Sequence, residues 1–290
     1  MIRKVTCILA LVLVVLSLGA CGKKEEAQAN KETAAPAVET PKIVYGEMVL
    51  IPAGEYIIGT NERDPENKKE FSNAYPEHKV KLPAYWIDKY EVTGKEYLDF
   101  TVNTSYVAEG QEEGKTWRTF FSFERAYNPV TYITYKDGEA YCKGVGKRLP
   151  TEEEWEAAAR GPNGNRFPWG NEWEPNKANT MDAGFHAPVD VGKFEGDVTP
   201  FGVRDMFGNV QEWTSSMYKA YPGNAKAGTQ EFSKGAGFRV IRGLGSRHTG
   251  VKASGSWVRS AYPGNYLADF GCRCAKNATP EEAAKAAPAK

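Results

Sequence analysis

Residues 201–213, FGVRDMFGNVQEW, form the most distinctive block of this 290-residue chain. Other distinctive blocks lie on both sides of it: MVLIPAG (48–54), IDKYEVT (87–93), GKRLPTEEEWE (146–156), FPWG (167–170), RVIRG (239–243), RSA (259–261) and GCRC (271–274). These blocks lie between two polar ends of the chain, in a span of about 230 residues, which one domain can fill.

Secondary-structure signals in this unit are short. Residues 48–54 and 56–59 predict two strands around a glycine turn, and residues 80–87 predict another strand. Helices are expected to begin after Thr93, Thr134 and Thr151, two of which open a capping box with a glutamate three residues later. After Gly161 the chain is rich in loops but keeps many bulky side chains, so we expect it to be ordered.

The ordered blocks resemble those of the formylglycine-generating enzyme family, also called the sulfatase-modifying factor family. The resemblance covers residues 46 to 275. It implies an α+β fold, namely a single compact irregular domain of the formylglycine-generating enzyme type that is C-type-lectin-like.

The N-terminus predicts export and lipidation. Arg3 and Lys4 precede an apolar run over 8–18 that is shorter than the roughly 20 residues a spanning helix needs. Such a run behind positive charge is typical of a signal peptide, here 1–20. The sequence LGAC (18–21) resembles a bacterial lipobox, which makes Cys21 the lipidation site. An ordinary signal peptide with an incidental cysteine is the alternative.

The expected organisation has four parts. After the signal peptide, residues 21–44 form a lipidated disordered tether, because they hold almost no bulky apolar side chain. Residues 45–276 form the folded domain, and 277–290 form a disordered tail of similar composition. We expect the protein to be lipid-anchored in the bacterial cell envelope. Gly22 after the cysteine favours the outer membrane, facing the periplasm.

Charge limits the partners. The formal net charge is zero and the isoelectric point is about 6.9, so no basic surplus indicates nucleic acid. The expected partners are the membrane, through the lipid anchor, and an unknown envelope protein or peptide.

Two sets of residues resemble calcium sites of the family. Calcium takes 6–8 oxygen ligands, which closely spaced carboxylates and carbonyls can supply. The first set is Asp205 and Glu212 by side chain with Gly208 and Val210 by carbonyl. The looser second set is Asn179, Thr180, Asp182 and Gly184. Asn, Asp and Gly also cap loops without any metal, which is the alternative. Any such ions would be structural.

The copper chemistry of the family is expected to be absent. Its oxidases bind copper through two cysteines that follow an Arg-Gly-Gly-Ser stretch, and thiolates suit reduced copper. The corresponding stretch here, residues 242–257, contains no cysteine, nor does any position between Lys143 and Gly271. We therefore expect no copper cofactor and no conversion of a sulfatase cysteine.

The remaining cysteines have other expected roles. By the resemblance, Cys142 and Cys274 pair as a structural disulfide, and such bonds persist outside the cytoplasm. Cys142 with Cys272 is the alternative pair. A leftover Cys272 is interpreted as a small buried hydrophobe, with a redox role as the alternative.

Three functions therefore compete. The first is a binding or envelope-assembly module with a groove near Trp213, Trp257 and Arg259, since aromatic and Arg side chains are enriched in binding sites. The second is a periplasmic oxidoreductase that uses chemistry other than a copper dithiolate. The third is a calcium-dependent glycan-binding module, which rests on fold analogy alone. We favour the first.

Overall fold

Three small sheets and five α-helices make up the part of the chain that the computed structural model describes, which is residues 46–63, 73–109, 114–225, 237–249, 251–265, 268 and 270–286. The predicted signal peptide, Cys21 and the tether lie outside the described residues. No helix among the described residues is long and apolar enough to cross a membrane.

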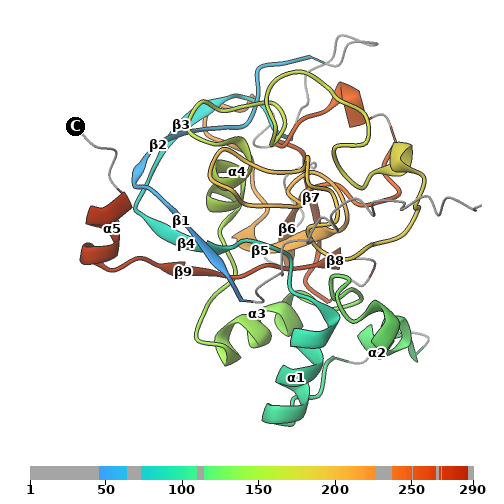
Figure 1. Cartoon of the computed structure of the whole chain (residues 1–290). Coiled ribbons are helices and arrows are strands. Elements are labelled where there is room, and N and C mark those ends of the chain that lie inside the picture. The colour runs from blue at the N-terminus through green and yellow to red at the C-terminus, as the bar shows by residue number, and fades with distance from the viewer. Residues whose placement is uncertain are drawn as a thin grey trace, which may run out of the picture. The chain divides into compact units, whose positions relative to one another are not determined.

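Two of the sheets share a curved outer wall (Figure 1). The first has the order β1 (Met48–Ile51), β4 (Tyr85–Asp88), β9 (Ala275–Asn277), with antiparallel neighbours. The second is the antiparallel pair β2 (Gly54–Ile58) and β3 (His78–Leu82). The single strand predicted over 80–87 is therefore wrong: Pro83 and Ala84 separate two strands that enter different sheets. Proline cannot donate a ladder hydrogen bond, so it interrupts a strand.

The third sheet lies in the centre of the domain, in the order β7-β6-β5-β8. Its strands are β5 (Gln211–Met217), β6 (Phe238–Arg242), β7 (Arg259–Pro263) and β8 (Phe270–Gly271). β5 to β7 pair antiparallel, whereas β8 runs parallel to β5. The FGVRDMFGNVQEW block leads directly into β5, so it connects the loop region to the central sheet.

Helices begin where the sequence predicts. Thr93, Thr134 and Thr151 are the N-caps of α1 (Gly94–Thr104), α3 (Tyr135–Gly144) and α4 (Glu152–Arg160), each with a complete capping box. Figure 1 shows α1, α3 and the short α2 (Trp117–Phe120) at one end of the molecule. The 3-10 turns η2 (Phe123–Arg125), η3 (Met181–Ala183) and η4 (Val251–Ala253) lie in the connecting segments.

The tail differs from its prediction. Residues expected to be disordered include the end of β9 and the helix α5 (Pro280–Ala286), which Figure 1 places beside the outer sheet. Thr279 accepts a hydrogen bond from Glu282 N, and the Glu282 carboxylate accepts one from Thr279 N. This reciprocal cap, together with alanine-rich composition, stabilises a helix that buries no residue.

Two apolar clusters hold the elements together. One gathers α1, α3 and the central sheet around Tyr97 and Trp213, and the other gathers α4 and the outer strands around Trp155. The indole of Trp155 donates to Glu212 on β5 over 2.8 Å, so α4 is fixed to the central sheet by a polar contact as well as by packing.

Candidate functional site

A cavity of about 290 Å³ opens where β5 begins and the loop after β6 passes beside it. Its lining residues are Gln211, Gly245, Arg247, His248 and Thr249. Gln211 is the first residue of β5, and the other four lie within the 242–257 stretch where the family resemblance places the catalytic segment. This space is the 245–249 cavity.

Gln211 supplies a fixed amide at the base of the cavity. Its side chain is only 6% exposed, and Nε2 donates to the Gly243 carbonyl over 3.2 Å. The hydrogen bonds of the described residues include none to its Oε1. An acceptor oxygen is therefore held at the cavity by the strand behind it.

His248 is held in one orientation by its own loop. Its Nδ1 accepts from Gly245 N over 2.9 Å, and its backbone N donates to the Gly245 carbonyl over 3.0 Å. Its carbonyl accepts from Met181 N of η3. Because Nδ1 is an acceptor, the ring proton of the neutral imidazole sits on Nε2, which makes this nitrogen a donor.

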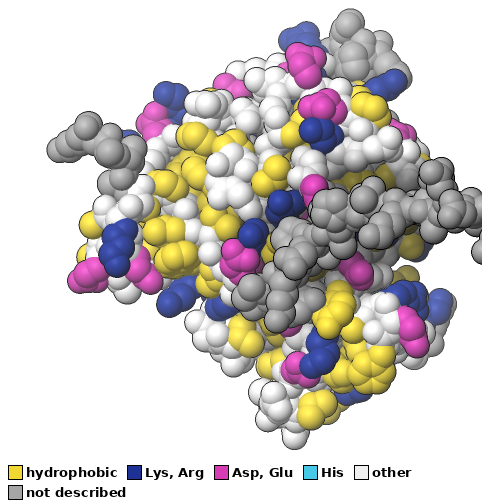
Figure 2. Space-filling view, viewed as in Figure 1, with side chains coloured by type: hydrophobic (Ala, Val, Ile, Leu, Met, Phe, Trp, Pro, Cys, Tyr) yellow, Lys and Arg dark blue, Asp and Glu magenta, His cyan; other side chains and the backbone are white. Residues whose placement is uncertain are grey.

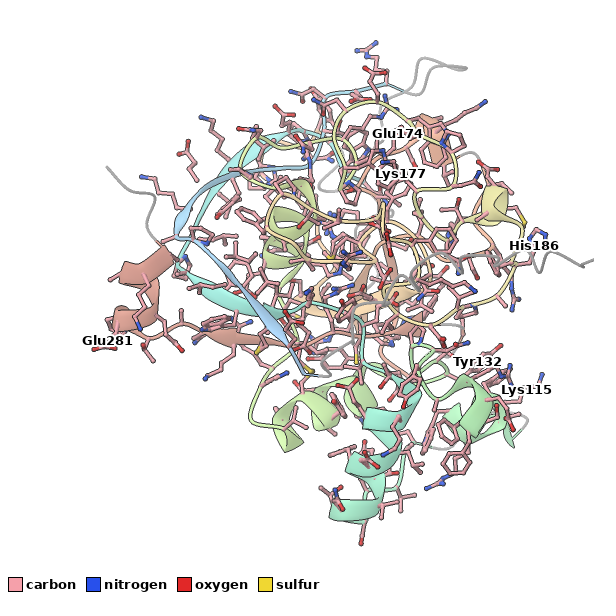
Figure 3. The ribbon with its side chains drawn as sticks, viewed as in Figure 1. Lys115, Tyr132, Glu174, Lys177, His186 and Glu281 are labelled. Atoms are coloured by element: carbon pink, nitrogen blue, oxygen red, sulfur yellow. A yellow bond between two sulfur atoms is a disulfide. The ribbon has the colours of Figure 1, made fainter. Side chains whose placement is uncertain are left out.

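Arg247 joins the cavity to the loop after η3. Its Nε donates to the His186 carbonyl over 3.1 Å. The adjacent Phe185 is 47% exposed and meets Phe194 edge-on, with Lys193 above its ring. Figure 3 shows His186 on this loop at the outer edge of the domain. The loop after η3 therefore contacts one residue of the cavity lining, and it carries an exposed aromatic side chain.

Asn209 fixes the floor below the cavity loop. Its carbonyl accepts from Ser246 N, and its Oδ1 accepts from Asn179 Nδ2 and from Val189 N, each at 2.9 Å. Its Nδ2 donates to Glu91 Oε2 over 2.6 Å. The residue adopts a left-handed conformation with φ 69°, which Asn tolerates better than most residues. Gln211 and Asn209 were not predicted as site residues, although both lie in the most distinctive block of the sequence.

The groove predicted from aromatic and Arg side chains is wrong. Trp213 is fully buried and its Nε1 donates to the Ile133 carbonyl. Arg259 is 2% exposed and pairs with Glu152 on α4 at 2.7 Å. Trp257 is 1% exposed, although it also borders a separate polar depression of about 350 Å³. Large aromatic and Arg side chains serve the core here, and composition alone cannot distinguish that use from binding.

Glu212 does not fit its predicted role as a calcium ligand. Both carboxylate oxygens accept from Arg273, at 2.7 and 2.8 Å, and one also accepts from Trp155. All three side chains are fully buried. Arg273 also donates to a set of backbone carbonyls, those of Asp88, Lys89, Arg204 and Asp205. The guanidinium therefore supplies the positive charge beside Glu212.

Asp205, Gly208 and Val210 are placed as turn residues. Asp205 has a left-handed φ of 57°, and its Oδ2 accepts from Gly192 N over 2.6 Å. Gly208 packs directly on the backbone of Asn179, and Val210 N donates to Glu91. Loop capping, the alternative given above, accounts for these contacts, so the first calcium set does not fit.

The second calcium set is divided between the interior and the surface. Asn179 and Thr180 are buried, whereas Asp182 on η3 is exposed and Gly184 ends that turn. The Asn179 Oδ1 atom is buried and has no hydrogen-bond partner, so this oxygen could serve as a cation ligand. No group of three or more His, Cys, Asp or Glu side chains within the described part of the chain is placed to hold a metal. Calcium at the second set stays a prediction.

Buried carboxyl groups below the loop have raised pKa values. Burial raises the pKa of Asp197 to about 8, with the nearby Asp205 carboxylate adding to the effect. Asp197 accepts from the backbone N atoms of Met206 and Phe207 at 3.2 and 3.1 Å. Burial also raises the pKa of Asp205, to about 6. Through these hydrogen bonds Asp197 holds the 201–213 loop in place. Neither Asp197 nor Asp205 lines the 245–249 cavity.

The predicted disulfide is confirmed. Cys142 on α3 is bonded to Cys274, with Cα atoms 5.6 Å apart and a sequence separation of 132. Cys272 is the free thiol and is fully buried, and burial raises its pKa well above the ordinary value. A buried thiol with a raised pKa is a poor nucleophile, which favours the interpretation of Cys272 as a core residue.

A compact α+β domain, with small sheets around a loop-rich half that carries the cavity, defines the class of formylglycine-generating-enzyme-like, C-type-lectin-like proteins. Among solved structures the fold is similar to PvdO from Pseudomonas aeruginosa, with 25% identity, a TM-score of 0.64, and coverage of 80% of this chain and 94% of that one. Variable protein 1 of Treponema denticola shows the same fold at 18% identity and a TM-score of 0.60, over 80% and 95% of the two chains.

The sequence identifies the family to which the chain belongs. Residues 33–278 match the sulfatase-modifying factor enzyme 1-like domain, and the chain belongs to this family. It is 27% identical to the mouse formylglycine-generating enzyme, over 90% of this chain and 84% of that protein. It is 30% identical to the bovine inactive C-alpha-formylglycine-generating enzyme 2, over 60% and 71%. It is 33% identical to the uncharacterized protein YfmG of Bacillus subtilis over 59% of this chain, but spans only 42% of that protein.

Proposed function

We propose that this chain is a lipid-anchored envelope protein whose 245–249 cavity binds a protein or peptide and does not oxidise a cysteine. One observation carries the proposal: the described residues that line the cavity supply an amide, a guanidinium, an imidazole and a hydroxyl, but no thiol. The cysteines that follow Cys21 are all in the core, two as the disulfide and one as a buried thiol.

The proposal follows from ligand chemistry. Soft thiolate ligands select reduced copper, whereas the groups at this cavity are hydrogen-bond donors and acceptors. Family membership does not decide the matter, because the relatives include proteins named as the active enzyme and as an inactive form. An amide and an imidazole with fixed orientations are suited to recognising a polar ligand.

A turnover assay tests whether the protein lacks copper-dependent oxidation of a cysteine peptide. The chain from residue 22 onward, which keeps the compact unit Ile43–Lys290, is loaded with Cu(I) and mixed with a sulfatase-type cysteine peptide. We expect no oxygen consumption beyond the protein-free control and no loss of the peptide thiol. Bound copper and calcium are measured by mass spectrometry in the same sample. Peptide oxidation would contradict the proposal and favour an oxidoreductase.

Lipidation is tested separately in cells. We expect the wild-type chain in the membrane fraction, with an acylated N-terminal peptide in mass spectrometry. The Cys21→Ser variant should lose the acyl groups and leave that fraction. An unmodified Cys21 in the mature protein would contradict the anchor but not the binding function.

A further inference from the structure

An aromatic cluster reaches the surface at the end of the domain that carries α1 and α2. Phe123 on η2 is 75% exposed, and its ring meets Phe121 edge-on with centroids 5.5 Å apart. Phe121 in turn meets the buried Trp117 of α2 at 5.8 Å. Figure 2 shows hydrophobic side chains gathered over this end of the molecule. Adjoining apolar side chains at a surface mark contacts with proteins or membranes.

Two guanidinium groups border the aromatic cluster. Arg118 is exposed and lies over the Trp117 ring, 4.6 Å from its centroid. Arg125 is also exposed, and it lines a small pocket together with Trp117 and Phe121. A guanidinium binds phosphate oxygens through paired hydrogen bonds. Arg beside aromatic side chains therefore suits the membrane interface, where lipid phosphates border the acyl chains and aromatic rings are enriched.

The chain enters the folded domain close to this cluster. The described structure begins at Gly46, which borders a small pocket together with Val92 and Glu96. Glu96 lies in the first turn of α1. Gly94 in the same turn packs on Phe121, because a Cβ at this glycine would lie 2.9 Å from the Phe121 ring. The entry point of the chain and the aromatic cluster therefore adjoin the same helical turn.

The predicted lipid anchor would hold this end of the domain near a membrane. Cys21 and Gly46 are 25 positions apart, and a flexible chain of that length spans about 25–30 Å on average. Acyl groups on Cys21 would therefore keep the entry point close to lipid headgroups. A contact that is weak by itself is strengthened by such a tether, because the tether raises the effective concentration of the two surfaces.

We propose that the aromatic cluster docks the domain on the membrane that holds its lipid anchor. Phe123 enters the boundary between headgroups and acyl chains, and Arg118 and Arg125 contact lipid phosphates. Apolar burial contributes most of the affinity, because Glu124 lies near Arg125 and offsets part of its charge. This inference rests on the lipid anchor of the proposed function and does not depend on peptide binding at the 245–249 cavity.

The first experiment measures whether the cluster lies in lipid when the domain is tethered. The chain from residue 22 onward is held by an N-terminal histidine tag on vesicles of phosphatidylethanolamine, phosphatidylglycerol and a nickel-chelating lipid. Glu124→Cys, next to Phe123, or Met217→Cys at the end of β5 is labelled with an environment-sensitive fluorophore. Cys272 is buried and the other two cysteines are bonded, so the label reaches the introduced thiol. We expect quenching by lipid-borne quenchers at position 124 and none at 217.

Vesicle binding of the untagged chain then measures the contribution of each side chain. Phe123→Ser should lower the partition coefficient about tenfold, because one ring is no longer buried in lipid. Arg118→Gln should lower it about fivefold on the same anionic vesicles. The matched controls are Met217→Ser and Lys219→Gln, which change an exposed apolar and an exposed cationic side chain on β5 and just after it. Both controls should bind as the wild type does.

The outcomes separate this inference from the proposed function. Equal quenching at positions 124 and 217, or a partition coefficient that Phe123→Ser leaves unchanged, would overturn the docking. A dimer in sedimentation that Phe123→Ser dissociates would also overturn it, because the cluster would then join two copies of the chain. The histidine tag replaces the acyl groups, so a failure here with acylated Cys21 in cells leaves the anchor intact. An unmodified Cys21 in cells contradicts the anchor itself.

Discussion

Several charged side chains are buried in the interior of the domain. Arg273 is fully buried and binds both oxygens of Glu212 as well as several backbone carbonyls. Desolvating such a pair costs free energy, which good geometry and additional hydrogen bonds offset. A sequence cannot show this arrangement, because Arg273 and Glu212 are 61 positions apart. The resemblance to a calcium site therefore assigned Glu212 to the wrong partner.

Removing Arg273 should be costly. Arg273→Ala leaves Glu212 buried without its cation, so we expect a loss of about 3–5 kcal/mol in the free energy of unfolding. Arg204→Ala is the control, because Arg204 donates only a long hydrogen bond to an exposed site and should change stability by less than about 0.5 kcal/mol. Urea unfolding of both variants measures these changes in the free energy of unfolding. Similar unfolding midpoints for the two would show that the Arg273 cluster contributes little.

Asp197 should make stability depend on pH. In the folded chain its pKa is raised to about 8, whereas the ordinary value is 3.8. Between these values the folded state holds a proton that the unfolded state releases. The free energy of unfolding therefore falls as pH rises through this window, by up to about 1.4 kcal/mol per pH unit, and the loss ends above the folded pKa.

The Asp197→Asn variant lacks this titrating group, so its stability should decline less between about pH 5 and 7. Asp190→Asn, at an exposed position, should keep the wild-type slope. Chemical denaturation at several pH values measures all three chains. Parallel slopes for wild type and Asp197→Asn would contradict the assigned pKa.

Among the elements, helix starts could be predicted and loop contacts could not. A capping box is local, so Thr93, Thr134 and Thr151 identify their helices from sequence alone. The 245–249 cavity instead depends on Asn209, which joins segments around residues 91, 179, 189 and 246. No sequence period reports such contacts. The predicted groove failed for the same reason, because burial of Trp213 is a tertiary property.

Gly208 is a position where two loops pack closely. A Cβ at this position would lie 2.6 Å from the Asn179 carbonyl oxygen and 2.8 Å from its backbone N. Because backbone atoms cannot move aside easily, Gly208→Ala should lower the free energy of unfolding by about 2–4 kcal/mol. Gly237→Ala is the control, since no atom lies within 4 Å of its Cβ. Thermal unfolding of the two variants compares them, and equal midpoints would contradict the close packing.

At the scale of the whole molecule, the disulfide joins two segments that lie far apart in the sequence. It links α3 to the segment between β8 and β9 across 132 positions. On the chain-entropy model a loop of this length gives about 5 kcal/mol. The family resemblance predicted this pair, but the packing of Cys272 beside Gly138 could be seen only in the structure.

We expect the Cys142→Ser/Cys274→Ser double variant to unfold at a clearly lower urea concentration than the wild type, with the difference lost when both are measured under reducing conditions. The oxidised Cys272→Ala variant should keep the free energy of unfolding of the oxidised wild type to within about 1–2 kcal/mol, because it removes only a buried thiol. A thiol titration of the unfolded, unreduced chain from residue 22 onward should find Cys272 as the free cysteine. Equal stability of the double variant and the wild type would contradict the role of the bond.

Binding at the 245–249 cavity is the central claim, and site-specific photocrosslinking in intact cells tests it most directly. A photoreactive amino acid replaces Thr249, which lines the cavity, or Val102, which is 66% exposed on α1. We expect a crosslinked envelope polypeptide at position 249 but not at position 102. Gln211→Met, which changes a side chain in the cavity lining, should remove this product. No crosslink at 249, or the same products at both positions, would contradict it.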